Sequence, residues 1–347
     1  MGQRGFFDVS RRLESISAKG DPLELLSTNI QFESFRAEIE EVTRLKSQDR
    51  KSNAGRKPYD AVLMFKILVL QTLYNLSDDQ LEYLIRDRLS FMRFLELGLE
   101  DPVPDATTVW LFREALASAG LIENLFATFN HHLEAKGYIA RGGQIVDATI
   151  VSAPKQRNSR DENEAIKSGE TPAGWEKKPA KNAQKDKDAR WTKKHGHSYY
   201  GYKNHIGIDA KHKFVRRFAA TDASVHDSQK LDDILDRSNT SSDVWADSAY
   251  RSAEIEAKLK AEGYKSRIHR RAHRNHPLSE RETAANTTRS RVRARVEHVF
   301  GHQENSMGRK LVRTIGIARA TVKIGMMNLV YNMRRLVQLE RMKAAPA

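Results

Sequence analysis

Apolar residues recur with helical spacing over most of the chain from Tyr59 to Lys136. Side chains three and four positions apart share one face of a helix, so the spacing predicts helices here rather than strands. The predicted helices are "YDAVLMFKILVLQTLYN", "SDDQLEYLIRDRLSFMRFLEL", "TTVWLFREALASAG" and "LIENLFATFNHHLEAKG". We therefore expect an all-helical domain at residues 54–140, after a weakly patterned N-terminal segment at 1–53.

Local signals support the ends of these helices. Ser77 and Gln80 have the spacing of a capping box, and Asp105 is a suitable N-cap before the third helix. Gly120 and Gly137 lie where the third and fourth helices should end.

Strand patterns replace the helical spacing after residue 140. "GGQIVDATIVS" is a short β-branched run, and "GYKNHIGIDAKHKFVRRFAATDAS" has the pattern of two strands joined by the turn at Asp209–Lys213. Helix and strand patterns then alternate through "DSQKLDDILDRS", "DVWADSAY", "SAEIEAKLKAEG" and "YKSRIH". Such an order predicts a mixed α/β domain, one sheet covered by helices, over residues 141–313. A C-terminal helix is expected within 314–347.

The segment 153–197 has a different composition from its surroundings. It is polar and rich in Lys and Arg, with Pro, Gly and Asn scattered through it and no apolar period. A segment of this kind is typical of a mobile loop or an insertion. We expect a basic mobile insertion within the α/β domain.

Length and composition narrow the possible functions. A chain of 347 residues can bury a core without covalent cross-links, and the absence of cysteine excludes disulfides and thiol nucleophiles. No run of about 18 apolar residues predicts a membrane span, and the first residues lack a signal-peptide pattern. We therefore expect a cytoplasmic protein, associated with the nucleoid if it binds DNA.

Charge points to a polyanionic partner. The net charge is +14 and the pI is about 9.8, which favours binding to nucleic acid. The excess is concentrated near the C-terminus, because residues 265–313 hold 13 basic and 4 acidic residues. This region should bind a polyanion most strongly.

Three acids occupy positions suited to chemistry. Asp147 lies within the first predicted strand, Asp247 closes the fourth, and Glu297 follows on the arginine-rich helix. Each also has an ordinary explanation: an edge-strand aspartate, a helix cap, and a helical ion pair with Arg293. Their joint placement favours a divalent-cation site, since Mg²⁺ prefers oxygen ligands and promotes phosphoryl transfer.

Several blocks resemble bacterial insertion-sequence transposases with a DDE active site. They are "IVDATIV", "GYKNHIGIDA", "WADSAYRS" and "RVRARVEHVFG", together with the helical block that begins "AGRKPYDAVLMFKILVL". The similarity is greatest to the insertion sequence 5 family, within the group that includes the insertion sequence 4 family. It implies a ribonuclease H-like catalytic domain in which Asp147, Asp247 and Glu297 bind Mg²⁺, or Mn²⁺ as a substitute. It also implies cleavage at terminal inverted repeats and joining of the 3′-hydroxyl to target DNA.

The wider group often has a Tyr, Arg, Glu, Lys pattern on its glutamate helix. Arg293 matches the arginine, whereas Ser290 and Glu304 occupy the tyrosine and lysine positions. Arg309 or Lys310 is then a candidate for the missing cation. The full set of expected DNA-binding residues is Arg289, Arg291, Arg293, Arg295, Lys203, His205, Arg309 and Lys310. For Lys203 and His205 a structural use is the alternative to lining a DNA groove.

The stretch "HGHSYYGYKNH" allows other interpretations. His195, His197 and His205 could be a metal site or part of a His-Asn nuclease motif, but that motif needs a ββα context and this stretch has the pattern of a strand. Tyr199, Tyr200 and Tyr202 could stack on unpaired bases or pack in the core. The two uses of the tyrosines stay open.

The helical region also leaves alternatives. It could hold a helix-turn-helix in which Thr107, Thr108 and Arg113 face a DNA groove, or form a bundle that supports catalysis or dimerisation. A homodimer is expected because two element ends must be brought together. A noncatalytic DNA-binding regulator and a hydrolytic nuclease are the alternative functions.

Overall fold

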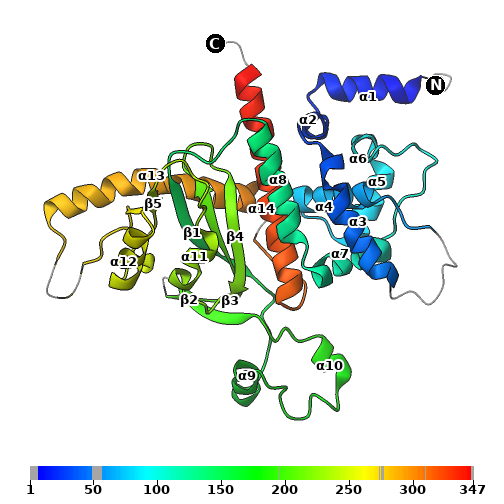
Figure 1. The fold of residues 1–347 in the computed structure, drawn as a ribbon. Coiled ribbons are helices and arrows are strands. Elements are labelled where there is room, and N and C mark those ends of the chain that lie inside the picture. Colours follow the sequence, from blue (N-terminus) through cyan, green and yellow to red (C-terminus); the bar gives the residue numbers. More distant parts are fainter. Residues whose placement is uncertain are drawn as a thin grey trace. The chain divides into compact units, whose positions relative to one another are not determined.

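The computed structural model describes residues 7–48, 57–194, 196–272, 274, 277–308 and 310–344. The chain divides into two compact units (Figure 1). The first takes in the described residues up to Lys136, together with Ser306–Gly308 and those from Gly325 onward, and the second takes in the rest. The C-terminal helix α14 (Ile317–Ala344) is therefore divided between the units rather than forming a separate part. None of the described helices combines the length and apolarity that crossing a membrane requires.

The first unit is all helical, as predicted. Its helices up to residue 136 are α1 (Asp8–Ala18), α2 (Pro22–Asn29), η1 (Phe32–Phe35), α3 (Arg36–Gln48), α4 (Ala61–Tyr74), α5 (Asp78–Asp87), α6 (Leu89–Leu95), α7 (Ala106–Ala119) and α8 (Ile122–Ala135). Helix α4 is buried on nearly all sides, which explains why its sequence is apolar throughout. The Ser77–Gln80 capping box and the Asp105 cap are both present.

Two predictions for this unit need correction. The N-terminal segment is more structured than expected, because α2, η1 and α3 bury Leu23, Phe35 and Ile39 in the core. The second predicted helix is two helices, α5 and α6, separated by an extended backbone at Arg88. On one continuous helix Phe94 would point roughly 140° away from Leu81, whereas the break lets both side chains enter the core.

The second unit is built on one mixed sheet. Its strands are β1 (Gln144–Ser152), β2 (Arg190–Lys194), β3 (His197–Asp209), β4 (Val215–Asp222), β5 (Asp243–Trp245) and β6 (Lys265–Ser266). The order is β2-β3-β1-β5-β6, and β4 also pairs with β3. Strand β3 is antiparallel to β1, β2 and β4, while β5 and β6 continue the sheet in parallel from β1. The predicted mixed α/β class is confirmed.

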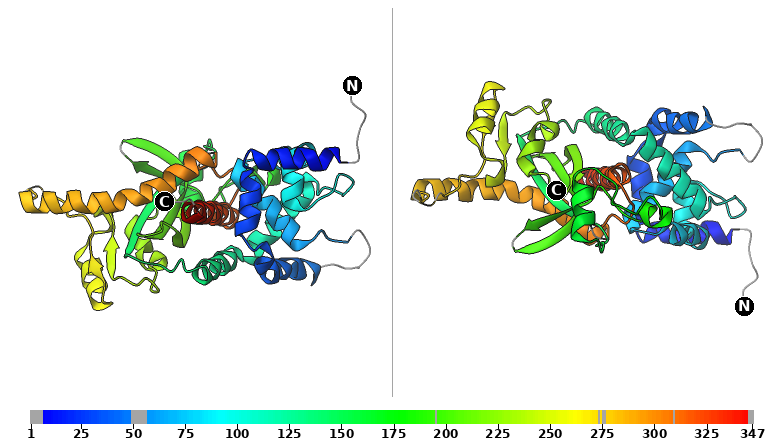
Figure 2. Two further views of the ribbon diagram at one scale, coloured as in Figure 1. Left: turned by 90° about the horizontal axis from the view of Figure 1, so that it is seen from above. Right: turned by 90° about the horizontal axis from the view of Figure 1, so that it is seen from below.

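Helices cover the sheet and form its core. On one face, α11 (Leu231–Ile234) and α12 (Ala253–Ala261) contribute Ile234 and Leu259 to a cluster with Val146 and Val244 of the sheet. The long helix α13 (Glu280–Ser306) runs lengthwise beside the sheet in both views of Figure 2. Because side chains alternate along a strand, Val146 enters the first cluster and Asp147 points to the opposite face.

The basic insertion is a small structured element instead of the irregular loop that its composition predicts. It contains α9 (Arg160–Lys167) and α10 (Pro179–Ala183), which lie beyond the sheet end of β2 (Figure 1). Trp175 is only 1% exposed and donates its indole N–H to Glu162. Glu162 also pairs with Lys181 and closes a capping box with Ser159, and these bonds lower the pKa of Glu162 to about 2. One buried tryptophan and one acid thus organise a segment without apolar period.

Strand β3 carries two residues that we expected to contact DNA. His205 is 0% exposed, and its Nε2 lies 2.9 Å from Thr221 Oγ1. Lys203 donates to Val225 O at 2.6 Å and to Asp227 Oδ1 at 2.8 Å. Burial contradicts His205 as a DNA contact and supports its structural use. Lys203 is half-buried, with a side chain 13% exposed, and is already engaged by Asp227.

The tyrosines of β3 divide between the two uses considered for them. Tyr200 and Tyr202 are buried, and their hydroxyls donate to the backbone oxygen and the carboxylate of Asp186. Burial raises the pKa of Tyr200 to about 12. Tyr199 is exposed. Packing therefore accounts for two of the three rings.

Gly207 offers a test of how closely α11 packs on the sheet. A Cβ at this position would lie 2.0 Å from Ile234 O, a backbone atom that cannot move alone. Gly207→Ala should destabilise the second unit by about 1–3 kcal/mol. Gly301→Ala is the matched control, because no atom lies within 4 Å and the residue is helical, so it should stabilise by about 0.5–1 kcal/mol. Equal thermal unfolding midpoints for the two variants would contradict the packing.

The buried His205 predicts a pH-dependent stability. Burial lowers its pKa from 6.5 to about 4. Between these values the unfolded chain binds a proton that the folded chain does not, so stability is complete above pH 6.5 and falls as pH drops toward 4. The slope from this group is about 1.4 kcal/mol per pH unit. Urea unfolding of wild type and His205→Gln should differ in slope within this window; an imidazole NMR titration of His205 with a midpoint near 6.5 would contradict the assignment.

Candidate functional site

Asp147 is a charged residue in the middle of a buried strand. Its residue exposure is 7%, and Oδ1 accepts from its neighbour's backbone, Ala148 N, at 2.8 Å. The flanking apolar residues Ile145 and Val146 fix β1 in the sheet between β3 and β5. A carboxylate is costly in such a place unless it is paired or binds a cation.

Asp247 reaches the same part of the sheet through strand register. Gln144 pairs with Val244 and Ile145 with Trp245 in the parallel β1–β5 ladder. Continuing this register places Asp247 level with Asp147 on neighbouring chain segments, which are typically about 4.8 Å apart within a sheet. Asp247 also caps the short helix η3 (Ser248–Tyr250) by accepting from Ala249 N at 2.8 Å. Capping and a site role are therefore compatible, since this bond uses only Oδ1.

Glu297 joins these acids through Arg293 on helix α13. Arg293 Nη2 lies 3.3 Å from Asp147 Oδ2 and 3.3 Å from Glu297 Oε1. The ion pair between Arg293 and Glu297 is thus present, but the same guanidinium also crosses to the strand. Glu297 is 62% exposed in its side chain, whereas Arg293 Nε is buried and has no hydrogen-bond partner. Helix α13 therefore brings two groups to Asp147: the accessible carboxylate of Glu297, and the guanidinium of Arg293, whose Nε has no hydrogen-bond partner.

Electrostatics tie the three acids into one site. Burial raises the pKa of Asp147 to about 6, Arg293 opposes this rise, and the charges of Asp247 and Glu297 add to it. Each of the other two acids therefore lies close enough to repel the charge on Asp147. A cation that binds here would relieve this repulsion.

The donors present suit a hard divalent cation. Carboxylate oxygens are the ligands that Mg²⁺ and Mn²⁺ prefer, and Mg²⁺ commonly uses only one or two from the protein. In the part of the chain that the structure describes, no three acidic or histidine side chains are gathered closely enough to hold an ion as they stand. Arg293 occupies the space between Asp147 and Glu297. The chemistry of the site fits a metal once this guanidinium shifts.

The other predicted cations have different surroundings. Arg291 is exposed on α13, while Arg289 is half-buried beside Asn286. Burial, with neighbouring arginines, lowers the pKa of Arg289. Arg295 donates to Ala210 O at 2.6 Å, which is a structural use of its guanidinium. Arg291 is the freest of these three to meet a ligand.

Lys310 is close to the site, whereas Arg309 lies outside the described residues. Lys310 Nζ is 3.0 Å from Thr149 Oγ1, and Thr149 shares the strand face of Asp147. Nζ is also 3.1 Å from Glu304, the residue at the lysine position of the pattern. Lys310 thus brings a cation beside Glu304 on the face of β1 that carries the acid.

A cavity of about 620 Å³ adjoins Asp247 and includes residues that sequence reasoning missed. Arg251, Arg271 and His226 line it with Asp247. Arg251 lies within the "WADSAYRS" block, so its place in that block was the available signal, whereas His226 and Arg271 are brought in by folding alone. Glu256 also lines the cavity and pairs with Arg251 at 3.3 Å, so the two arginines face two acids and the lining carries no excess of positive charge from them.

The helical unit corrects the groove-facing interpretation of Arg113. Its guanidinium makes two bonds to Asp78, of 2.7 and 2.9 Å, and a third to Gln71. Arg113 therefore joins α7 to α4 and α5 instead of facing DNA. Thr107 is exposed on α7, and the backbone N–H of Thr108 donates to the side chain of the N-cap residue Asp105.

Comparisons with known proteins show the family of the chain. The family model described as "Transposase DDE domain" matches residues 140–333, and the one described as "Transposase domain (DUF772)" matches residues 11–115. Among solved structures, the chain is similar to piggyBac transposase in a synaptic complex with hairpin DNA. That match has 13% identity and a TM-score of 0.50, and it covers 94% of this chain and 77% of the other. At this identity the likeness concerns the fold. The first family match spans more than half of the chain, and the chain belongs to the DDE-domain transposases.

Proposed function

We propose that this transposase cleaves the ends of its DNA element and joins the freed 3′-hydroxyl to target DNA at Asp147, Asp247 and Glu297. The observation that carries the proposal is the shared site of these acids, in which Asp147 is buried, repelled by the other two and held by Arg293. A purely structural ion pair would not need three acids on two strand segments and a helix.

The sheet supports a ribonuclease H-like fold for the second unit. Three antiparallel strands, β4, β3 and β1, are followed by two parallel ones, β5 and β6. We infer that β1 and the end of β5 carry the first two acids and that α13 carries the third. The quoted motif blocks further support membership of the insertion sequence 5 family.

In the proposed mechanism the acids would hold Mg²⁺, with Mn²⁺ as a substitute, and so activate water or a 3′-hydroxyl and stabilise the leaving oxygen. Asp147 supplies a fixed, buried oxygen, while Glu297 supplies an accessible one from the opposite element. Arg293 would turn from the acids toward a DNA phosphate, using its unpartnered Nε. The ammonium group of Lys310 contacts Thr149 and Glu304. It would lie beside the DNA strand that approaches Asp147.

DNA binding and pairing of ends complete the proposal. The net charge of +14 favours attraction to duplex DNA, and exposed Arg291 would contact its backbone. Recognition of the terminal inverted repeats is assigned to the helical unit, where Thr107 is exposed on α7. A homodimer would bring two ends together.

Substitution of the acids tests the proposed site. Asp147→Asn, Asp247→Asn and Glu297→Gln keep side-chain size but remove the negative oxygen ligands. Each should reduce Mg²⁺-dependent cleavage and joining by at least about 100-fold, because even the partners of metal ligands are worth 10- to 100-fold. Binding of an inverted-repeat end should persist in a gel-shift assay.

Asp161→Asn, on the exposed side of α9, is the matched control and should retain full activity. Full activity in all three acid variants would contradict the site. Cleavage without joining in wild type would identify a hydrolytic nuclease, and end binding without either reaction would identify a noncatalytic regulator.

Arg293 provides a second test through metal binding without DNA. Its guanidinium neutralises Asp147 and Glu297 in the structure, so it competes with a cation for their oxygens. In Arg293→Ala the acids repel each other unless a metal is present. Mg²⁺ should therefore raise the thermal unfolding midpoint more in this variant than in wild type, since a ligand of the folded state stabilises it. Arg291→Ala is the control, and an equal Mg²⁺ effect in all three proteins would contradict the competition.

A further inference from the structure

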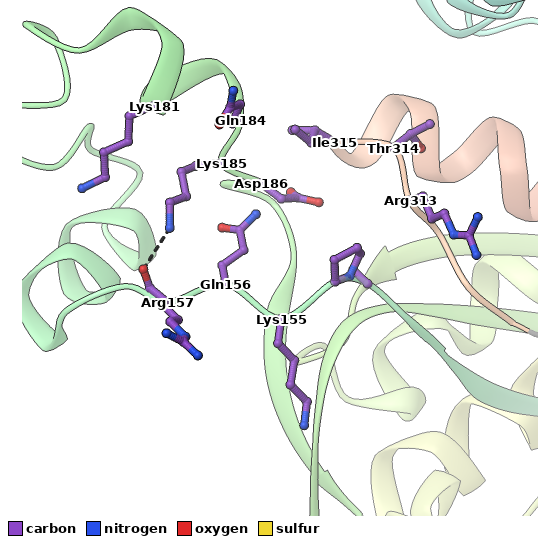
Figure 3. Close-up of a pocket in the computed structure, with 12 residues that line it drawn as sticks. Lys155, Gln156, Arg157, Lys181, Gln184, Lys185, Asp186, Arg313, Thr314 and Ile315 are labelled. Carbon is purple, nitrogen blue, oxygen red and sulfur yellow. Dashed lines mark hydrogen bonds between the residues drawn. The ribbon is translucent and has the colours of Figure 1, made fainter. Parts of the chain in front are cut away.

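A second cavity lies away from the acids, where the basic insertion meets the end of β1. Its volume is about 540 Å³. Three segments line it: residues 153–157 after β1, residues from Lys181 to Asp186 in and after α10, and residues 313–315 before α14. Figure 3 shows side chains from all three segments around this space. All of them belong to the second unit.

The lining is strongly basic. It contains Lys155, Arg157, Lys181, Lys185 and Arg313. Asp186 is the single acid among the described lining residues. Its carboxylate already accepts from Tyr202 Oη and from the backbone N–H groups of Asp188 and Ala189. The carboxylate of Asp186 is therefore engaged within the protein. Lys181 pairs with Glu162 outside the lining, whereas the other four cations have no acid partner among the described residues.

Several polar groups of the lining are unused. Among the described residues, Arg157 and Arg313 form no ion pair through their side chains. Gln156 Oε1 and Thr314 Oγ1 are buried and have no hydrogen-bond partner. A threonine hydroxyl can donate to an anionic oxygen, and a glutamine side chain carries both a donor and an acceptor. Unsatisfied buried groups beside unpaired cations indicate a polar, anionic ligand.

The cavity is connected to the acid site by the backbone of β1. Ser152 N donates to Lys310 O at 3.1 Å, and Val312 N donates to Ser152 O at 2.9 Å, so residues 310–312 run beside the strand end. Lys310 and Arg313 therefore lie in a segment beside the end of β1, between the position of Asp147 and that of Lys155 along the strand. The eight residues from Asp147 to Lys155 span at most about 26 Å, or about seven to eight base pairs of duplex DNA.

We propose that this cavity binds the phosphate backbone of double-stranded DNA on one side of the reacting phosphate. The inference rests on the proposed function, because it is the acid site that would fix where the reacting phosphate lies. Cations from three separated segments suit successive backbone phosphates better than one small anion. Such contacts position DNA without reading its sequence. The basic insertion thereby acts as a DNA clamp next to the catalytic strand.

The test is the salt dependence of DNA binding by the full chain. The probe is a fluorescein-labelled duplex of about 30 base pairs and arbitrary sequence, titrated from about 50 to 200 mM salt. The variant Lys155→Ala/Arg157→Ala/Arg313→Ala should bind more weakly and lower the slope of log affinity against log salt by about 3, roughly 1 per lost phosphate contact.

The control is Lys167→Ala/Lys177→Ala/Lys178→Ala, which removes the same charge from exposed positions of the insertion outside the cavity. It should keep the wild-type slope and the wild-type cleavage rate. Equal slopes for the two triple variants, with matching thermal midpoints, would overturn the clamp. A loss of affinity for duplex RNA or an acidic peptide without any loss for DNA would also overturn it.

The outcome is separable from that of the acid site. If the acid variants remain active while the cavity variant loses its salt slope, the catalytic assignment fails and DNA binding at the cavity stands. If the acid variants are inactive while the cavity variant keeps the wild-type slope, the clamp alone fails. Thr314→Val gives a milder check, because it removes only the unpartnered hydroxyl and should weaken DNA binding without changing the slope.

Discussion

Asp147 is a carboxylate buried in the middle of a strand, and the cost of burying its charge is the constraint on which the candidate site depends. Burial raises the pKa of Asp147 to about 6, Arg293 opposes the rise, and the charges of Asp247 and Glu297 add to it. The sheet fixes Asp147 so firmly that it cannot move away, and Arg293 supplies the positive charge between Asp147 and Glu297. A site of this kind is prepared for a cation and for the phosphates that accompany it.

The sheet makes this arrangement possible through its register. The parallel register of β1 and β5, continued beyond its last pair of Ile145 with Trp245, brings Asp247 level with Asp147, and α11 packs closely on Gly207. Helix α13 then crosses the acid-bearing face with Arg293 and Glu297 one turn apart. Rigid strands hold two acids while a helix brings the third, so the site joins segments about 150 residues apart in the chain.

Local patterns in the sequence were sufficient to predict much of the secondary structure. The helical unit, the Ser77–Gln80 capping box and the β-branched run around Asp147 follow from neighbouring residues, and the structure confirms them. That three acids fall on successive elements also led to the candidate site before any geometry was known. The roles of Asp147, Asp247 and Glu297 in catalysis stay predictions.

Tertiary packing decided the features that the sequence could not give. His205 and Lys203 look suited to DNA binding, but pairing of β3 on both sides buries one and engages the other with Asp227. Arg113 similarly satisfies Asp78 across two helices. The basic insertion has no apolar period because its core is small, with Trp175 and Ile166 as its large buried side chains. Such partners are distant in sequence, so no local pattern reveals them.

The most direct test of the account is to locate a bound divalent cation. Crystals of the full chain with an inverted-repeat end and Mn²⁺ would give anomalous scattering at the metal. We expect anomalous peaks within coordination distance of Asp147, Asp247 and Glu297, with Arg293 turned away from the acids. Mn²⁺ peaks only at other positions, with Arg293 still bridging Asp147 and Glu297 on bound DNA, would contradict it.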